Sequence, residues 1–120
     1  MSVKNKNNFR KLEKQRQHLM DYLLSSVRLI CGSYSDVLVR CGRPGCHCQD
    51  KPIHPVTRLE IREDGKRRTK VVRAIDREYV KQLVDEYKKH KDALKELQKI
   101  HDEQKELLRK LISDKDKGYT

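Results

Sequence analysis

The C-terminal third of this chain carries an unbroken heptad pattern. Two rows of seam positions repeat every seven residues, and no Gly or Pro occurs between Asp76 and Gly118. One row holds Val80, Tyr87, Leu94, His101 and Leu108, and the other holds Leu83, His90, Leu97, Gln104 and Leu111. Five consecutive heptads with charged residues between the rows are typical of a coiled coil. The pattern predicts a long helix over residues 76–113, with Asp76 as its N-cap, and a short tail over residues 114–120.

A second helical pattern covers residues 9–30. Its apolar stripe, broken by Arg16 and Ser26, consists of Phe9, Leu12, Leu19, Leu23 and Ile30. Gly32 stands just past the last periodic residue, where a helix-ending glycine is common, and Cys31 is expected to be buried at that helix end. At ~1.5 Å per residue, this helix would be about 33 Å long and the C-terminal one about 54 Å. An antiparallel pair would therefore leave part of the long helix for a second copy or a larger protein partner.

Composition limits what else the chain can build. Only 35% of the 120 residues are apolar and 39% are charged, with one Phe and no Trp, so a large globular core is excluded. This length suits one domain, residues 1–120. No stretch approaches the roughly 18 apolar residues of a membrane span, and the N-terminus lacks the apolar core of a signal peptide. We expect a cytoplasmic protein without membrane contact.

Between the helical patterns, over residues 33–75, the apolar period changes from seven to two. Alternation over Tyr34–Arg40 predicts a strand, and the segment Arg58–Lys70 around Asp64-Gly65 predicts a β-hairpin. The expected fold class is α+β, with an N-terminal helix, a small antiparallel β-sheet and a long C-terminal coiled-coil helix.

The turn of the hairpin decides which residues share a face. A two-residue Asp64-Gly65 turn would place Leu59 opposite Lys70 and mix apolar with basic residues. A three-residue turn over residues 63–65, with Gly65 in the left-handed conformation, gathers the apolar residues on one face instead. We expect this second register. It places on the opposite face the basic residues Arg58, Arg62, Lys66, Arg68 and Lys70.

Three of the four cysteines lie in the segment Cys41-Gly-Arg-Pro-Gly-Cys46-His-Cys48. In a cytosolic protein such clustering indicates a metal site before a disulfide, because the compartment keeps thiols reduced. The Gly-rich turn between Cys41 and Cys46 allows both to approach one ion. Zinc is the expected cofactor, since it accepts thiolate and imidazole ligands in tetrahedral geometry. Free or redox-active thiols are the alternative.

The candidates for the fourth ligand are Cys31, His47, His54 and His18. Cys31 lies at the far end of an extended segment, and His47, between two ligands, would most easily point away. His54 lies between two prolines six residues after Cys48 and can fold back. The predicted zinc ligands are therefore Cys41, Cys46, Cys48 and His54. Such a thiolate-rich set, with only Asp50 as a nearby carboxylate, favours a structural zinc knuckle over catalysis, so we expect no enzymatic activity.

The charge of the chain points to a polyanionic partner. The formal net charge is +11, with the basic excess in the N-terminal arm and the middle of the chain. Lys and Arg side chains bind phosphates with release of counterions, so nucleic acid, either DNA or RNA, is the expected partner. A flexible N-terminal arm carrying Lys4, Lys6 and Arg10 would extend the contact of the hairpin. The alternative function is a coiled-coil protein-protein adaptor without nucleic-acid contact.

These residues resemble an uncharacterised family of small bacterial proteins that carry a CG(K/R)PxCxC motif. The matching order is a basic helix, a short strand, the Cys41–Cys48 segment, a His-Pro step, a basic hairpin and a long charged helix, over most of residues 30–112. The resemblance implies metal ligands at Cys41, Cys46 and Cys48, with His54 at the downstream His of the family. Members are often encoded beside transposases and integrases. The resemblance thus implies an accessory factor of a transposase or other mobile-element machinery.

Overall fold

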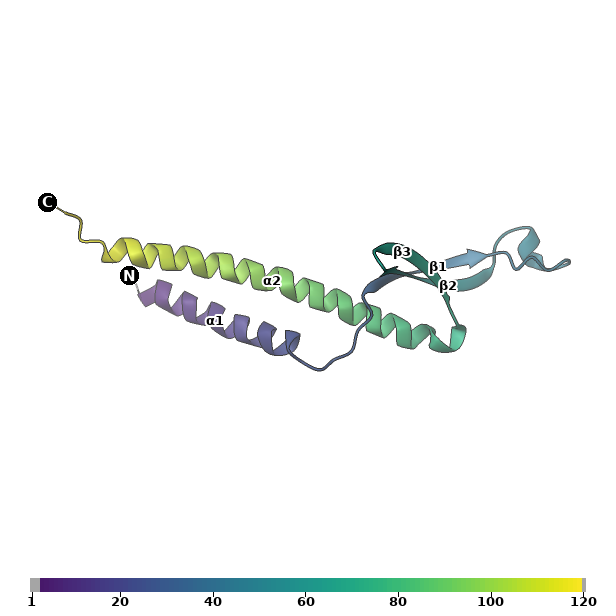
Figure 1. Ribbon diagram of the computed structural model, residues 1–120, viewed down its shortest axis with the longest axis horizontal. Coiled ribbons are helices and arrows are strands. Elements are labelled where there is room, and N and C mark those ends of the chain that lie inside the picture. Colours follow the sequence, from purple (N-terminus) through teal and green to yellow (C-terminus); the bar gives the residue numbers. More distant parts are fainter. Residues whose placement is uncertain (1–2, 120) are drawn as a thin grey trace. The chain divides into compact units, whose positions relative to one another are not determined.

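The computed structural model describes residues 3–119 and has the predicted α+β architecture (Figure 1). The elements are α1 (Val3–Leu23), β1 (Gly32–Val39), β2 (His54–Glu63), β3 (Lys66–Val72) and α2 (Arg77–Lys115), with short 3-10 turns η1 (His47–Gln49) and η2 (Ala74–Asp76). The strands form one antiparallel sheet in the order β1-β2-β3. The chain packs as two compact units. The helical unit comprises the described residues up to Ser26 and from Lys89 onward, and the sheet unit is Val27–Lys88. Neither α1 nor α2 has the length of apolar sequence needed to cross a membrane.

In the helical unit, α1 runs antiparallel to the C-terminal part of α2 (Figure 1). The Tyr22 hydroxyl and His90 Nδ1 are hydrogen bonded at 3.1 Å, and Gln104 Nε2 donates to Glu13 Oε2 at 2.8 Å. Later residues of α1 therefore meet earlier residues of α2. No residue of α1 is buried. The buried residues that α2 contributes here are Ala93, Ile100, Gln104 and Leu107.

One row of the predicted heptad seam is wrong in the helical unit, although Val80 and Tyr87 of that row are partly buried in the sheet unit. The row containing Leu97, Gln104 and Leu111 is partly or fully buried, as predicted. The other buried row is Ala93, Ile100 and Leu107, one residue before the predicted Leu94, His101 and Leu108. Leu94 and Leu108 remain 56% and 43% exposed. The shift buries the aliphatic side chain of Ile100 where the predicted row would bury an imidazole, which explains the preference.

The predicted bounds of the first helix are also wrong. Instead of residues 9–30, the helix covers Val3–Leu23, and the following segment is extended. The backbone N–H of Ile30 donates to the Leu83 carbonyl at 3.1 Å, and the Ile30 side chain packs against the core of the sheet unit. Ile30 thus continues the apolar period of α1 but is held by the sheet unit, because tertiary packing overrides local periodicity.

Gly32 and Cys31 also differ from expectation, because the helix ends at Leu23, well before them. Gly32 does not end a helix but begins β1, where a Cβ atom would lie 2.6 Å from the Glu60 carbonyl oxygen. Glycine is needed there because the backbones of β1 and β2 approach closely. Cys31, expected to be buried, is exposed in the extended segment just before the strand.

The core of the sheet unit lies between the sheet and the first turns of α2. Its buried members are Leu59, Val72 and Val84, and Ile30, Tyr34, Ile61 and Val80 pack against them. Complete burial of one aliphatic side chain contributes ~1.5–3 kcal/mol. A core of this size therefore stabilises the sheet only modestly.

Polar contacts fix the same face of the sheet to α2. Asp36 accepts hydrogen bonds from Lys81 Nζ and from Thr57 Oγ1, both at 2.7 Å, and the Tyr34 hydroxyl donates to Asp85 at 3.1 Å. Lys81 and, next, Thr57 lower the pKa of Asp36. Because Thr57 is only 1% exposed, its hydroxyl needs this acceptor. We call this the helix-side face and its opposite the open face.

The hairpin has the register of a two-residue turn, not that of the expected three-residue turn. Leu59 pairs with Lys70, and the turn consists of Asp64 and Gly65 alone. Both turn residues have positive φ, 53° for Asp64 and 76° for Gly65. This combination is that of a two-residue turn whose twist matches the strands, and Asp-Gly favours it strongly. The predicted three-residue turn is wrong, and so is the single basic face that depended on it.

Candidate metal centre and basic hairpin

The loop between β1 and β2 is shaped by two glycines. Gly42 and Gly45 have φ of 76° and 79°, which other residues rarely adopt. The backbone N–H of Cys46 donates to the Arg43 carbonyl at 3.3 Å, and that of Gln49 donates to the Cys46 carbonyl at 3.1 Å, at the start of η1. The loop therefore folds back toward the ends of the strands it connects, away from the β2–β3 turn (Figure 1).

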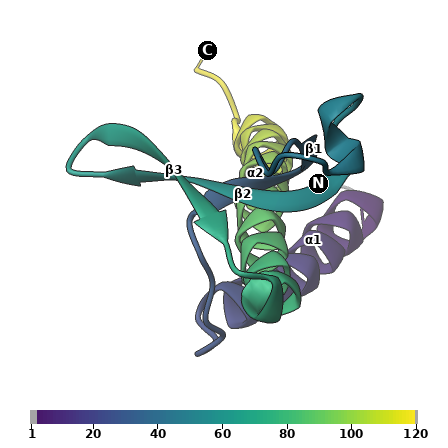
Figure 2. The same ribbon diagram turned by 90° about the vertical axis from the view of Figure 1, so that its right-hand side faces the viewer.

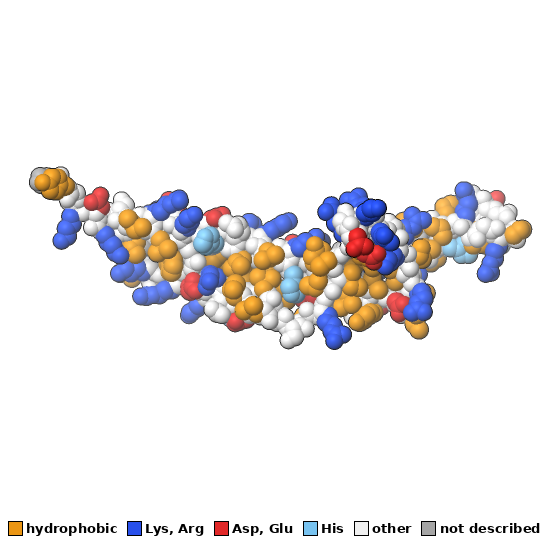
Figure 3. Space-filling view, viewed as in Figure 1, with side chains coloured by type: hydrophobic (Ala, Val, Ile, Leu, Met, Phe, Trp, Pro, Cys, Tyr) orange, Lys and Arg blue, Asp and Glu red, His pale blue; other side chains and the backbone are white. Residues whose placement is uncertain are grey.

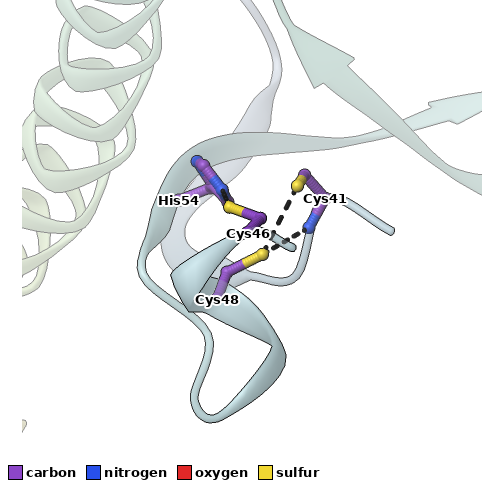
Figure 4. Close-up of side chains that lie close together, drawn as sticks. All are labelled: Cys41, Cys46, Cys48 and His54. Atoms are coloured by element: carbon purple, nitrogen blue, oxygen red, sulfur yellow. Dashed lines mark hydrogen bonds between the residues drawn. The ribbon is translucent and has the colours of Figure 1, made fainter. Parts of the chain in front are cut away.

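This loop gathers four possible metal ligands, Cys41, Cys46, Cys48 and His54 (Figure 4). One ligand atom from each lies within 4.8 Å of all the others. The sulfur atoms of Cys41 and Cys48 are 3.4 Å apart, and Cys46 Sγ is 3.3 Å from His54 Nε2. His54 is the first residue of β2 and pairs with Val39, the last of β1. A metal ion held here would fasten the end of β1 to the start of β2.

The thiols of this group affect one another's ionisation. The backbone N–H of Arg43 and then the Cys48 thiol lower the pKa of Cys41 to about 7. For Cys48, the backbone N–H of Cys41, 3.2 Å from the sulfur, lowers the pKa, but burial and the neighbouring thiols outweigh it, so the pKa is raised. Repulsion between neighbouring thiolates thus opposes the ionisation of a second thiol. A bound cation would remove this repulsion and favour the thiolate form of every ligand.

The other residues weighed as the fourth ligand lie outside this group. Cys31 and His47 are exposed, and His18 belongs to α1. The backbone near the group is held by Arg40, whose Nε donates to the Cys48 carbonyl at 3.2 Å. Cys48 itself is fully buried. The four ligands predicted from sequence are thus the four that the structure brings together.

The five hairpin cations expected on one face are divided between two. Residues paired across the β2–β3 register share a face, and successive residues alternate. The open face carries Arg58, Arg62 and also Arg67, which sequence analysis left out. The helix-side face carries Lys66, Arg68 and Lys70. Figure 3 shows Lys and Arg side chains gathered around a small acidic group in the region of the hairpin.

Two glutamates neutralise part of this charge. Glu60 forms an ion pair with Arg67 at 2.9 Å on the open face. Glu63 contacts Lys70 at 2.8 Å and Arg68 at 3.6 Å. The hairpin cations without an ion pair to any residue among 3–119 are Arg58, Arg62 and Lys66.

The N-terminal cations are not in a flexible arm. Lys4, Lys6 and Arg10 are exposed residues of α1, in the helical unit, so that expectation is wrong. Arg67 was missed because the wrong register separated it from Arg62, its actual partner. The signal that could have found it is the Asp-Gly dipeptide, which favours the two-residue turn.

Comparison with known proteins gives a family but no function. No curated protein and no solved structure matches the chain. A family model described as a domain of unknown function, DUF6788, matches residues 9–82. The match spans more than half of the chain and includes the four possible metal ligands and all three strands. The chain therefore belongs to the DUF6788 family.

Proposed function

We propose that this protein is a zinc-stabilised nucleic-acid-binding protein without enzymatic activity. Zinc is favoured by the ligand set, three thiols and one imidazole, which is typical of structural zinc sites. Zn–S bonds of ~2.3 Å would place tetrahedral sulfur atoms about 3.8 Å apart, close to the separations within the group. Four protein ligands leave no position for a reacting water. The ion would serve to order the loop and the sheet.

The observation that carries nucleic-acid binding is the excess of cations on the β2–β3 hairpin. After Glu60 and Glu63 have been paired, three cations of the hairpin have no ion pair among residues 3–119. A hairpin stabilised only by its own pairing would gain from balanced charges, because repulsion between like charges destabilises a sheet. Phosphates of a nucleic acid would supply the missing anions. Figure 2 supports access, since within the sheet unit the turn of the hairpin extends well to one side of the first turns of α2.

The setting that we propose is a mobile genetic element. It rests on the resemblance of the Cys41–Cys48 segment and its surroundings to small bacterial proteins encoded beside transposases. The protein would act as an accessory factor that holds nucleic acid for a larger enzyme.

The experiment is a fluorescence anisotropy titration of DNA and RNA with zinc-loaded protein at several salt concentrations. Each phosphate contact contributes about −0.9 to the slope of log K against log salt on duplex DNA. Arg62→Glu is compared with Lys95→Glu, a matched charge reversal on an exposed position of α2. We expect a clear loss only for Arg62→Glu. Equal losses would mean that net charge alone matters, and absence of binding by the wild type at low salt would refute the proposal.

A second candidate function is self-association through α2, alone or as the basis of an adaptor role. The heptad row that α1 does not cover leaves Leu94 and Leu108 exposed, and Ile112 one turn after Leu108 is exposed as well. Figure 3 shows hydrophobic side chains reaching the surface along α2. Leu94 also lines a depression together with Met20 and Leu97, so the exposed row is continuous with the α1–α2 interface. Such a row fits a second copy of the chain, which would complete a four-helix arrangement.

A further inference from the structure

The open face of the sheet contains a conflict of charge. The register pairs Arg62 directly with Arg67, and both side chains lie on this face beside the turn. Like charges directly opposite one another in an antiparallel pair are destabilising. No residue among those described forms an ion pair with Arg62, whereas Arg67 contacts Glu60 at 2.9 Å. A local arrangement that costs stability without a compensating contact is expected at a binding site.

The same face is hollowed beside this arginine pair. A depression of about 260 Å³ is lined by Ser33, Tyr34, Ser35, Arg58, Glu60 and Thr69. It therefore offers a guanidinium group together with three small hydroxyl side chains. Arginine and hydroxyl side chains are the groups that proteins use most often to contact phosphate oxygens. The volume is sufficient for a phosphate group.

Glu60 is the acidic residue of this face that lies beside its cations. The residue lines the depression, and its carboxylate is paired with Arg67. Both side chains of this pair are largely exposed, 40% for Glu60 and 73% for Arg67. An exposed ion pair is weak, and Arg67 can readily exchange it for two hydrogen bonds to one phosphate. Glu60 thus behaves as an internal competitor for the cations around it.

We propose that the open face binds the sugar-phosphate backbone of duplex DNA, and that a phosphate displaces Glu60 from Arg67. This inference rests on the proposed nucleic-acid binding and names its surface. The open-face positions of the three strands include no Phe, Tyr or Trp, and Tyr34, which lines the depression, directs its hydroxyl to Asp85 on the helix-side face. Single strands, in contrast, are bound mainly by stacking on aromatic rings. The major groove of B-DNA admits a two-stranded ribbon, and the narrow major groove of duplex RNA does not.

The test uses pairs of variants that change charge equally on opposite faces of one hairpin. Glu60→Gln is compared with Glu63→Gln, since each removes one carboxylate and releases at least one cation. Arg62→Gln is compared with Arg68→Gln. Each zinc-loaded, full-length variant is titrated by fluorescence anisotropy against a mixed-sequence DNA duplex and against one of its strands, at several salt concentrations. Circular dichroism checks that each variant retains the wild-type fold.

We expect Glu60→Gln to tighten duplex binding roughly five- to tenfold and Glu63→Gln to change it by less than about twofold. Arg62→Gln should weaken binding roughly tenfold and flatten the salt slope by about 0.9, with a smaller effect for Arg68→Gln. If Glu60→Gln does not fold, the arginine pair decides alone. Equal effects on the two faces, or tighter binding of the single strand, would overturn this inference while leaving nucleic-acid binding intact. A wild-type protein that binds neither duplex nor single strand would remove both proposals.

Discussion

Removal of the proposed metal ion should destabilise the sheet unit far more than the helical unit. The loop between β1 and β2 has little packing of its own, since Cys48 is its one buried residue among residues 40–53. The apolar core of the unit, which contains Leu59, Val72 and Val84, does not include any residue of this loop. Order in the loop should therefore depend on its few hydrogen bonds and on the proposed metal ion.

The size of the effect follows from binding linkage. A metal that binds only the folded state stabilises it by RT ln(1 + [L]/Kd), or about 2.7 kcal/mol at a free metal concentration of 100 times Kd. For a small domain, 1 kcal/mol shifts Tm by roughly 4–8 °C. Addition of a strong chelator should therefore lower the Tm of the sheet unit by about 10–20 °C. Thermal unfolding by circular dichroism over a series of free zinc concentrations measures this shift.

Hydrogen exchange with mass spectrometry then locates the change. Protection should be lost first at the ends of β1 and β2 near His54, while the α1–α2 pair keeps its protection. His54→Gln should reproduce the effect of the chelator, whereas His47→Gln and Cys31→Ser, which change residues outside the ligand group, should not. If the chelator leaves both Tm and exchange unchanged, the metal does not hold this sheet together and the reasoning fails.

Three further predictions concern packing and charge. Replacement of Leu94 and Leu108 by Asp should abolish self-association, measured by sedimentation velocity, without unfolding α2, because both side chains are exposed in a single copy. Wild-type protein that remains monomeric at every concentration would exclude self-association through α2. Asp36→Asn should destabilise the protein near neutral pH and much less at about pH 2. Lys81 and Thr57 lower the folded-state pKa of Asp36, so the stabilising contribution of its carboxylate is lost as pH falls through that pKa. Urea unfolding of the wild type and the variant at both pH values checks this, and a pH-independent difference would contradict it. Gly32→Ala should cost about 1–3 kcal/mol in the same assay, because its Cβ would lie 2.6 Å from the Glu60 carbonyl oxygen, and an unchanged midpoint would show that the strand pair can yield.

Sequence alone was sufficient for the features that depend on local spacing. The fold class and the long Gly-free helix follow from periods of seven and two, which neighbouring residues set among themselves. The clustering of the possible metal ligands was also predictable, because Cys41, Cys46 and Cys48 lie within eight residues and a glycine-rich turn leaves few ways to arrange them. His54 followed from chain reach, since it is near in sequence and begins the strand that returns beside the cluster.

Where sequence analysis failed, two local solutions were nearly equivalent and a distant contact chose between them. Ile30 fits the stripe of α1, yet it lies in an extended segment because the sheet core and Leu83 hold it there. In α2, the predicted row with His101 and the buried row with Ile100 are offset by a single residue, and packing against α1 selected the row with Ile100.

The hairpin is the clearest case of a decision made by three-dimensional structure. The sequence allows either turn, and sorting of apolar from basic residues favoured the longer one. Backbone twist favoured the two-residue turn, with Asp64 and Gly65 both at positive φ, and the sheet accepted mixed faces as a result. That register alone places Arg62 opposite Arg67 and Glu60 beside them. Sequence thus determined that the hairpin is basic, whereas the turn geometry and pairing of the folded strands decided which cations face together, because a shift of one residue moves every side chain to the other face.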